Sequence, residues 1–420
     1  MLFNNKFSKN KTYMDYLQSS WKQLTIDNKY FYLFSFLISI LVFSVYSNIV
    51  YVNFSVPDDS WMLLNNKFVT TLSFNVEYFK EVFTQKNNIQ YSPINTLYYA
   101  FIFKIDGYNP FWYHLGSIVL HIINTIIVVK IFKIFVRDFK IIDYISFYGI
   151  IILWSIHPLN VEAVVWISAS KILLSSSFIY LCIYLVLKNK TRTLKQNILI
   201  QIFFVLACFT KEQSILLPAI ILILDICYHK KKFKDLLTWE YLSYFIILCL
   251  FLWITMLFNY DSMKLVNHSF MQRLVLMFYS LFWYGINIFI PQNLHYHYPF
   301  PIKPNEAIPF QYYIYVLLFL VLIIYGVSLL KKSNIFTSDN FYLIIICLVF
   351  LAPCLHIIPM YRPAIYADRY MYQPLLFGLI YLFLKYSKTS YFNYLIMIYI
   401  IYFSVYSYDL VMNWSIININ

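Results

Sequence analysis

Apolar runs long enough to cross a membrane recur along almost the whole chain, with short polar segments between them. About 20 consecutive apolar residues are needed for a helix to span the hydrocarbon core of a bilayer. The pattern therefore predicts an all-α polytopic membrane protein with about 11 transmembrane helices. We place the crossings at 30–52, 113–132, 141–156, 171–187, 196–210, 213–228, 241–258, 311–330, 341–358, 370–386 and 391–408.

The basic residues between these runs predict the orientation of the chain. Of the 32 Lys and Arg residues, 21 fall in the N-terminal tail and in alternate loops. Because Lys and Arg accumulate in cytoplasmic loops, we expect a cytoplasmic N-terminus and an outer C-terminus, in a plasma or inner membrane. One further apolar run, Phe270–Ile290, lies between two loops of the outer side, so we expect a re-entrant or interfacial element there.

The composition agrees with a membrane protein and removes one class of function. The chain is 61% hydrophobic and only 12% charged, whereas soluble domains are about 25% charged. The net charge of +13 resides in the basic loops, so it reflects topology and does not predict nucleic-acid binding. The six cysteines lie within apolar runs, and we expect them to be core side chains, with neither disulfides nor a metal site.

The crossings divide the chain into three parts and leave one long outer loop. The parts are a cytoplasmic tail, 1–29, a multi-span membrane domain, 30–410, and a short outer tail, 411–420. The first tail has no small-residue cleavage site and is not a signal peptide. In the first outer loop, 55–112, Asn75–Gln85 has the spacing of an amphipathic helix on the membrane surface. Ile94–Ile105 is apolar but too short to span.

The candidate chemistry begins with two adjacent carboxylates, Asp58 and Asp59, directly after the first crossing. Other ionisable side chains in or near the crossings fall on the same predicted outer side, where such groups are functional candidates by default. They are His114, His121, His157, Glu162, Lys171, Lys211, Glu212, His295, His297, Asp368 and Arg369. Together they predict one outer cavity that collects acids, histidines and cations.

This set of groups suits transfer from a lipid-phosphate donor. A carboxylate at the membrane rim can act as a general base toward an acceptor hydroxyl, and cations can hold a phosphate leaving group. Whether the acids act alone or with Mg²⁺ or Mn²⁺ stays open. Structural explanations also stay open: histidines satisfied at helix ends, Arg369 extended toward the interface, and an acidic pair that caps a helix beginning near Ser60.

Five stretches resemble, in the same order, motifs of the GT-C membrane glycosyltransferases. Among these they are most similar to the protein O-mannosyltransferase-like family that usually carries tetratricopeptide repeats. The stretches, which cover about 57–378, are PDDSWMLLNN, YSPINTLYYAFIFKIDGYNPFWYHLGSIVLHIIN, HPLNVEAVVWISASKILLS, TKEQSILLPAIILILD and ADRYMYQPLLFG. The resemblance implies a GT-C-like fold with its active site in the first outer loop and a polyprenyl-phosphate-linked sugar as donor.

The resemblance also implies roles for individual residues. One carboxylate of the acidic pair is the catalytic base, and we favour Asp58 because Pro57 fixes the turn that precedes it. Arg369 is a candidate for binding the donor phosphate. The remaining motif positions are candidates for substrate binding: His114, His121, His157, Glu162, Lys171, Lys211 and Glu212.

The chain departs from the family pattern in three places. Ser92 stands where many relatives have an Arg, and Asn65-Asn66-Lys67 lacks the acidic residue that often follows the first motif. No 34-residue period precedes Asn420, so we expect the repeats to be absent and assign them no role in docking an acceptor.

We therefore expect a membrane glycosyltransferase that moves a sugar to a hydroxyl of a protein or glycan acceptor on the outer face. One alternative is a transporter for lipid-linked glycans, which should show internal repeats and broken helices in matching halves. Another is a non-catalytic membrane scaffold that has kept the fold, an alternative favoured by the missing repeats and by Ser92. Neither the sugar nor the acceptor follows from the sequence.

Overall fold

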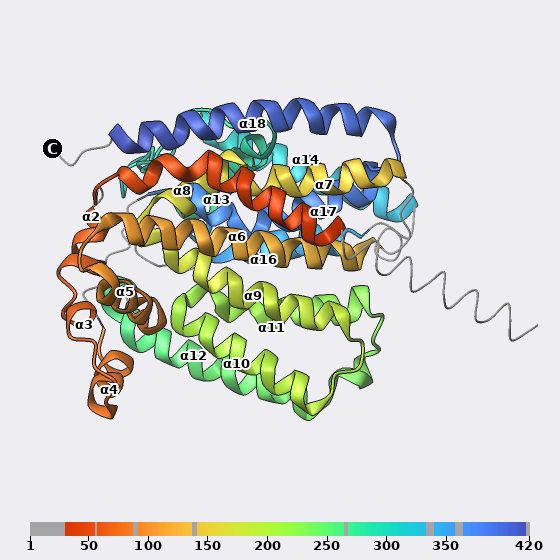
Figure 1. Cartoon of the computed structure of the whole chain (residues 1–420). Helices are drawn as coiled ribbons and strands as arrows, with labels where there is room; N and C mark the ends of the chain where they lie inside the picture. Colours follow the sequence, from red (N-terminus) through yellow and green to blue (C-terminus); the bar gives the residue numbers. More distant parts are fainter. Residues whose placement is uncertain are drawn as a thin grey trace, which may run out of the picture.

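The computed structural model describes residues 30–54, 57–86, 91–136, 141–263, 268–332, 340–357 and 364–416. These residues form a bundle of helices and contain no strand (Figure 1), which confirms the all-α prediction. The predicted cytoplasmic tail, 1–29, lies outside the described residues, as do residues 417–420. The last helix, α18 (Ser390–Ile416), continues well into the segment predicted as an outer tail.

Five helices are long and apolar enough to cross a membrane, or six if one bent pair is counted as a single crossing. The five are Tyr30–Tyr51, α6 (Pro110–Phe135), Ile167–Lys188 with α9 (Ser170–Lys188), Trp239–Phe258 of α12 (Trp239–Met263), and Tyr391–Trp414 of α18. The bent pair joins α7 (Ile141–Ser155) to α8 (Pro158–Val165) at an angle of 47°. These helices are typical of an integral membrane protein, but their number does not confirm the predicted 11 crossings.

The remaining predicted crossings are also helical, although within the described residues they do not meet the same criteria of length and apolarity. They are α10 (Leu194–Thr210), α11 (Leu217–Ile223), α14 (Phe310–Lys332), α16 (Tyr342–Leu351) and α17 (Tyr372–Tyr386). The run predicted as re-entrant or interfacial is one continuous helix, α13 (Phe270–Phe289), which contains no reversal of the chain. Of the two forms, the interfacial helix fits this geometry better.

The helices pack in two groups around a shared aromatic core. α9 packs along α6 and α10, and α18 packs along α7. In Figure 1, α9 to α12 occupy the lower side, and α7, α18 and the first helix the upper side. Between them Trp154, Tyr180 and Tyr372 are fully buried, and the rings of Trp154 and Tyr372 meet edge to face at 5.2 Å. Long-range ring packing of this kind holds helices that are far apart in the sequence.

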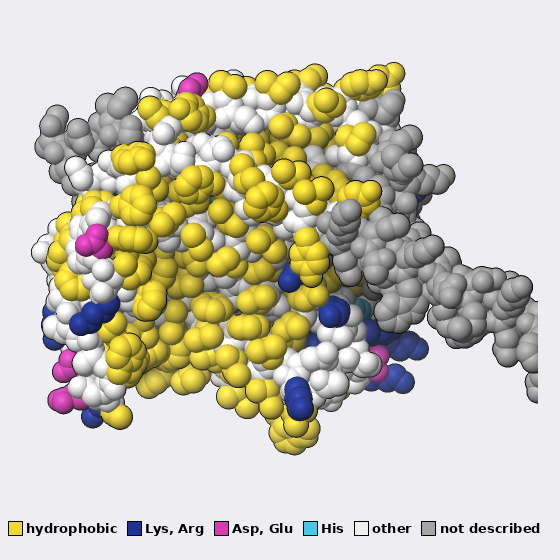
Figure 2. Space-filling view, viewed as in Figure 1, with side chains coloured by type: hydrophobic (Ala, Val, Ile, Leu, Met, Phe, Trp, Pro, Cys, Tyr) yellow, Lys and Arg dark blue, Asp and Glu magenta, His cyan; other side chains and the backbone are white. Residues whose placement is uncertain are grey.

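The outer surface of the bundle is largely apolar. Figure 2 shows hydrophobic side chains across most of one face, with charged side chains gathered toward its ends. Trp253 of α12, Leu317 of α14 and Ile401 of α18 are each more than half exposed. Contiguous exposed apolar surface of this extent is unfavourable in water, so it matches a lipid environment.

The described part of the segment predicted as the first outer loop folds into short helices at one end of the bundle, on the left of Figure 1. They are α2 (Pro57–Asp59), α3 (Lys67–Thr70), α4 (Val76–Thr84) and α5 (Pro93–Asp106). The prediction of a helix near Asn75–Gln85 is confirmed by α4. Its buried face, however, is formed by Tyr78 and Val82, whereas Val76 is 85% exposed. Within the described residues, α5 packs on α3 of the same segment and on α10 of the bundle.

All six cysteines are free. Three of them, Cys182, Cys208 and Cys354, are buried, which agrees with the expectation that they are core side chains. Cys249 is exposed on α12, where it belongs to the apolar surface.

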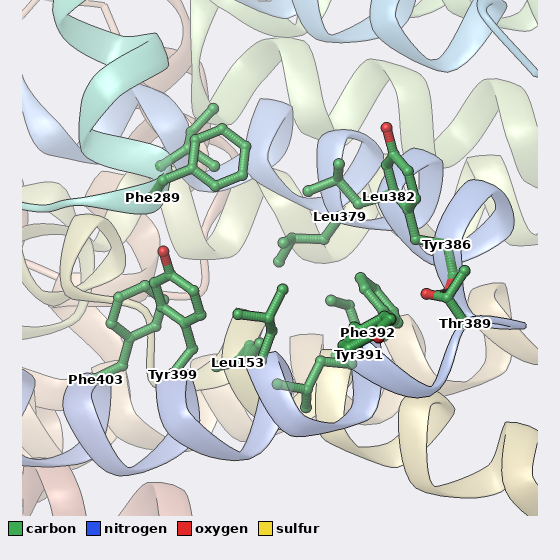
Figure 3. Close-up of a pocket in the computed structure, with 14 residues that line it drawn as sticks. Leu153, Phe289, Leu379, Leu382, Tyr386, Thr389, Tyr391, Phe392, Tyr399 and Phe403 are labelled. Atoms are coloured by element: carbon green, nitrogen blue, oxygen red, sulfur yellow. Dashed lines mark hydrogen bonds between the residues drawn. The ribbon is translucent and has the colours of Figure 1, made fainter.

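An apolar cavity of about 400 Å³ lies between α7, α13, α17 and α18. Figure 3 shows Leu153, Leu379 and Phe403 around it, with the hydroxyl groups of Tyr386 and Thr389 at one end. No acid, lysine, arginine or histidine is among its lining residues. The cavity is therefore not part of the charged site described next.

Candidate active site

The two adjacent acids, Asp58 and Asp59, point to different partners. Asp58 is partly exposed, and its Oδ1 accepts a hydrogen bond from the Trp61 indole at 3.0 Å. Asp59 is only 2% exposed. Its Oδ1 accepts hydrogen bonds from the backbone N–H of Ser168, at 3.1 Å, and from the Ser168 hydroxyl. The pair thus consists of one accessible carboxylate and one carboxylate fixed to the segment before α9.

This geometry bears on the explanation of the pair as a helix cap. Asp59 precedes the helical turn Ser60–Leu64, but its side chain makes no capping hydrogen bond to that turn. The carboxylate bonds instead to Ser168, which is distant in the sequence. A role of Asp59 as a simple N-cap is therefore not supported.

The segment from His157 to Lys171 brings several candidate residues to the same end of the bundle. His157 caps α8, because its Nδ1 accepts a hydrogen bond from the backbone N–H of Leu159 at 3.2 Å, and Pro158 follows at a position where proline favours helix initiation. Extended backbone at Trp166 ends α8. A single 3₁₀ turn, Ile167–Ala169, then leads into α9. The break lets the short α8 and the start of α9 face the first outer loop.

A buried ion pair joins α8 to the segment before α17. Oε1 of Glu162 pairs with the Arg369 guanidinium, and Oε2 accepts a hydrogen bond from the Arg369 backbone N–H at 2.7 Å. The guanidinium also lies over the rings of Trp166 and Tyr370, at 4.6 and 5.0 Å from their centroids. Only 17% of the Arg369 side chain is exposed. Arg369 is therefore held within the protein, which does not fit a side chain that merely extends to the interface.

Asp368, beside this ion pair, is buried and takes part in a second contact. Its Oδ1 accepts a hydrogen bond from the Tyr298 hydroxyl at 2.8 Å. Burial and the nearby Glu162 carboxylate raise the pKa of Asp368 well above its usual range. The Asp368–Tyr298 contact connects the site to the loop that follows α13.

Two lysines complete the cationic part of the site. Lys211, at the end of α10, is 4% exposed, and its ammonium lies 5.8 Å from the centre of the Tyr370 ring. Within the described residues Lys211 makes no ion pair. Lys171, in the first turn of α9, lies 3.6 Å from the Met62 sulfur. The charges of Lys211, Glu212, Asp58 and Arg369 all act on the Lys171 ammonium, so the fold places these charged residues near one another.

The three predicted histidines are buried links between segments. His114 Nε2 lies 3.2 Å from the Val52 carbonyl oxygen. His121 bonds to the Tyr372 hydroxyl at 2.7 Å and to the Ser155 carbonyl at 2.8 Å. His157 Nε2 lies 3.0 Å from the Ile288 carbonyl. Protein groups occupy both ring nitrogens of His121 and His157, so the geometry describes structural residues. Their role in substrate binding stays a prediction without support from these contacts.

Several residues of the site were not singled out by sequence reasoning. Ser168 and Trp166 lie inside the HPLNVEAVVWISASK stretch but carry no charge, and charge was the signal that selected the other positions. Tyr298 and Tyr370 are two of 41 tyrosines, so nothing in the sequence separates them from the rest. Their roles depend on contacts with Asp368, Arg369 and Lys211.

The described residues contain no group of three or more His, Cys, Asp or Glu side chains placed to hold a metal ion. His295 and His297, predicted to face the same cavity, are exposed in the loop after α13. The site therefore consists of an accessible carboxylate, a buried Glu–Arg pair and two lysines. Chemically it can accept a proton and bind an anion.

Comparisons with known proteins give one distant relative. No family model matches the chain, and no solved structure matches it. Over 180 residues the chain is 24% identical to the protein O-mannosyl-transferase F38B6.6 of Caenorhabditis elegans. The match covers 41% of this chain and 25% of the relative. A glycosyltransferase-like relationship is supported at this level, and nothing finer.

Proposed function

We propose that this chain is a membrane glycosyltransferase that takes its sugar from a polyprenyl-phosphate donor. The observation that carries the proposal is the Lys211 ammonium, which is buried and makes no ion pair within the described residues. The charges of Lys211 and Arg369 both act on Glu162, so two cations share one buried carboxylate. Burying a charge is costly unless an opposite charge compensates it. A phosphate group bound near Lys211, Lys171 and Arg369 supplies that charge.

Asp58 is the residue best suited to act as the base. It is more accessible than Asp59, whose carboxylate is committed to Ser168. In the proposed reaction Asp58 accepts the proton of the acceptor hydroxyl, and the oxygen forms a bond to the anomeric carbon of the sugar. The bond from that carbon to the phosphate oxygen breaks at the same time. Polyprenyl phosphate leaves with the electron pair, and the three cations stabilise its charge.

The description of the Caenorhabditis elegans relative as a mannosyl-transferase supports sugar transfer as the reaction. Because the match spans a quarter of that relative's length, the acceptor, a hydroxyl of a protein or glycan, remains part of the proposal. A GT-C-like architecture belongs to the proposal as well. The assignment of α2 to α5 to the outer face rests on the excess of Lys and Arg in the opposite loops.

The orientation can be tested by labelling. Single cysteines introduced in place of Asn10 and Asn418, in a background without the native cysteines, are expected to react from opposite sides of sealed vesicles. Because an odd number of crossings separates the two positions in the proposed topology, reaction of both cysteines from the same side would rule that topology out.

The activity is tested with the purified full chain in vesicles that contain polyprenyl-phosphate-linked mannose. Release of polyprenyl phosphate on addition of an acceptor is the expected result, and addition of EDTA, Mg²⁺ or Mn²⁺ decides the dependence on metal. Movement of the lipid across the vesicle without release supports the transporter. The absence of both release and movement supports the scaffold. The three outcomes therefore distinguish the three functions.

A further inference from the structure

A second cavity is connected to Asp368 through Tyr298, which lines the cavity and donates a hydrogen bond to the Asp368 carboxylate. It has a volume of about 420 Å³ and is formed by α13, by the loop that follows it and by the segment before Asp368. Its walls include Trp283, Tyr298, Tyr366, Gln292, Asn293 and His295. Cavities of this size are typical of sites for small ligands.

The floor of this cavity is a rigid aromatic surface. The rings of Trp283 and Tyr366 stack, with their centroids 4.0 Å apart and an interplanar angle of 18°. Tyr298 lies 4.6 Å from Tyr366 and 5.0 Å from Trp283. The backbone N–H of Ile365 donates to the Tyr298 carbonyl at 2.9 Å, and this hydrogen bond joins the two chain segments that form the floor. The aromatic faces are therefore preorganised.

The rim, in contrast, carries polar side chains that the protein leaves available. Gln292, Asn293 and His295 are exposed. Their backbone is nevertheless fixed, because the Gln292 N–H donates to Asn287 Oδ1 at 3.0 Å and the His295 N–H donates to the Tyr298 hydroxyl at 2.7 Å. Within the described residues the side-chain amides of Gln292 and Asn293 make no hydrogen bond. The rim thus offers both donors and acceptors on an ordered loop.

We infer that this cavity is a binding site for a saccharide ring. A pyranose has an apolar face of C–H groups, which packs on an aromatic ring, and a rim of hydroxyls, which both donate and accept hydrogen bonds. An aromatic floor with an amide and imidazole rim matches both features, whereas a lipid chain would leave the rim unsatisfied. The inference deepens the proposed function and rests on it for the source of the sugar.

The position of the cavity connects it to the anion site. The Tyr298 hydroxyl lies on the cavity and donates to Asp368, and Tyr366 shortly precedes Arg369 in the chain. A saccharide in this cavity therefore lies next to the groups that hold the donor phosphate. It is either the sugar of the donor or a sugar already present on the acceptor.

Binding can be measured without turnover. The purified full chain in detergent is titrated with methyl α-mannopyranoside and methyl β-glucopyranoside, and contact is followed by saturation-transfer NMR. Trp283→Leu is expected to weaken binding roughly tenfold, since the stacking surface is lost. The matched control is Trp239→Leu, because Trp239 is 84% exposed at the start of α12, and it should bind as the wild type does.

A second variant keeps the test decisive if Trp283→Leu does not fold. Gln292→Ala combined with Asn293→Gly removes both exposed amides. Glycine accepts the left-handed backbone of Asn293, whose φ is 50°. Weaker saccharide binding by a correctly folded double variant supports the site. Unchanged binding in both variants overturns it, as does wild-type protein that binds neither glycoside.

Two further measurements identify the source of the sugar and distinguish failure of the saccharide site from failure of the proposed function. If polyprenyl-phosphate-linked mannose competes with the glycoside, the site holds the donor sugar; if it does not, the site holds a sugar of the acceptor. Saccharide binding by protein that releases no polyprenyl phosphate supports the site and overturns the proposed function. If the wild type and both variants release polyprenyl phosphate with equal KM for the donor and for the acceptor, the site is overturned and the proposed function is left intact.

Discussion

Two buried arginines lie at opposite ends of the bundle, and their surroundings differ in how completely the charges are paired. Arg192, in the loop between α9 and α10, donates to both carboxylate oxygens of Asp225, at 3.1 and 2.5 Å, and pairs with Glu240 at 2.5 Å. Lys231 and the Tyr241 hydroxyl also contact Asp225. The Arg192 and Asp225 side chains are 0% exposed.

Arg369 has a single carboxylate partner, and its neighbour Lys211 makes no ion pair within the described residues. The guanidinium also lies over the rings of Trp166 and Tyr370. Burial alone therefore does not distinguish a functional arginine from a structural one. A network that is complete within the protein fixes helices, whereas two cations that share one buried carboxylate leave an excess positive charge, which supports the proposed anion site.

The largest expected difference concerns turnover. Asp58→Asn removes the proposed base at the Arg369 end while keeping the size of the side chain, and a loss of about 10²–10⁴ in kcat is expected. The measurement is release of polyprenyl phosphate, with thermal unfolding as a check that the fold is kept. Asp235→Asn, at the Arg192 end, is the matched control and should retain full activity. If Asp58→Asn and Asp59→Asn both transfer sugar normally, the mechanism proposed here is wrong.

The next difference concerns stability. Arg192→Met removes the guanidinium that Asp225 and Glu240 share and leaves Lys231 as the remaining cation on Asp225. It is expected to cost about 3 kcal/mol of folding free energy. The loss appears as a lower unfolding temperature of the purified protein. Arg192→Met and Asp225→Asn should be strongly non-additive, because the two residues share one network. Additive effects would show that the network at this end is not a structural lock.

Lys211→Met is expected to weaken donor binding without lowering stability, in contrast to Arg192→Met. Removal of a buried ammonium that makes no ion pair should leave the unfolding temperature unchanged or raise it. The KM for the lipid-linked donor should rise roughly tenfold, because a charge-assisted contact to phosphate is lost. Lys388→Met, an exposed lysine at the other end, serves as the control. An unchanged donor KM would remove the main support for an anion site.

The smallest expected effect is a change in the pH dependence of stability when Asp368 is replaced. Because its pKa is raised in the folded protein, the folded state binds its proton more tightly than the unfolded state does. The stability that it contributes is present below the ordinary pKa of an aspartate and declines as pH rises toward the folded-state pKa. Asp368→Asn keeps an acceptor for Tyr298, so it should flatten this decline and unfold at the same or a higher temperature at neutral pH. A steeper decline in the variant would contradict the assignment.

Much of the architecture follows from local properties of the sequence. Apolar run lengths predicted where helices lie, and each of the runs is helical in the described residues. The acidic pair and the charged positions Lys171, Lys211 and Arg369 were predicted to share one site; of these, Asp58, Lys211 and Arg369 lie close enough for their charges to act on Lys171. Such features depend on single segments, or on charges that a membrane protein tolerates in few places. They can therefore be identified before the fold is known.

Other features arise only when distant segments meet. Glu162 and the Arg369 backbone are bonded across 207 positions, and Asp59 and Ser168 across 109. Nor did hydropathy foresee the 47° bend between α7 and α8, where His157 caps the second helix and Pro158 begins it. A hydrophobic run specifies that a helix forms. Which of its faces meets which neighbour is decided by the packing of all helices together. That packing makes Asp58 accessible, Asp59 buried, and both ring nitrogens of His121 and His157 bonded to protein groups.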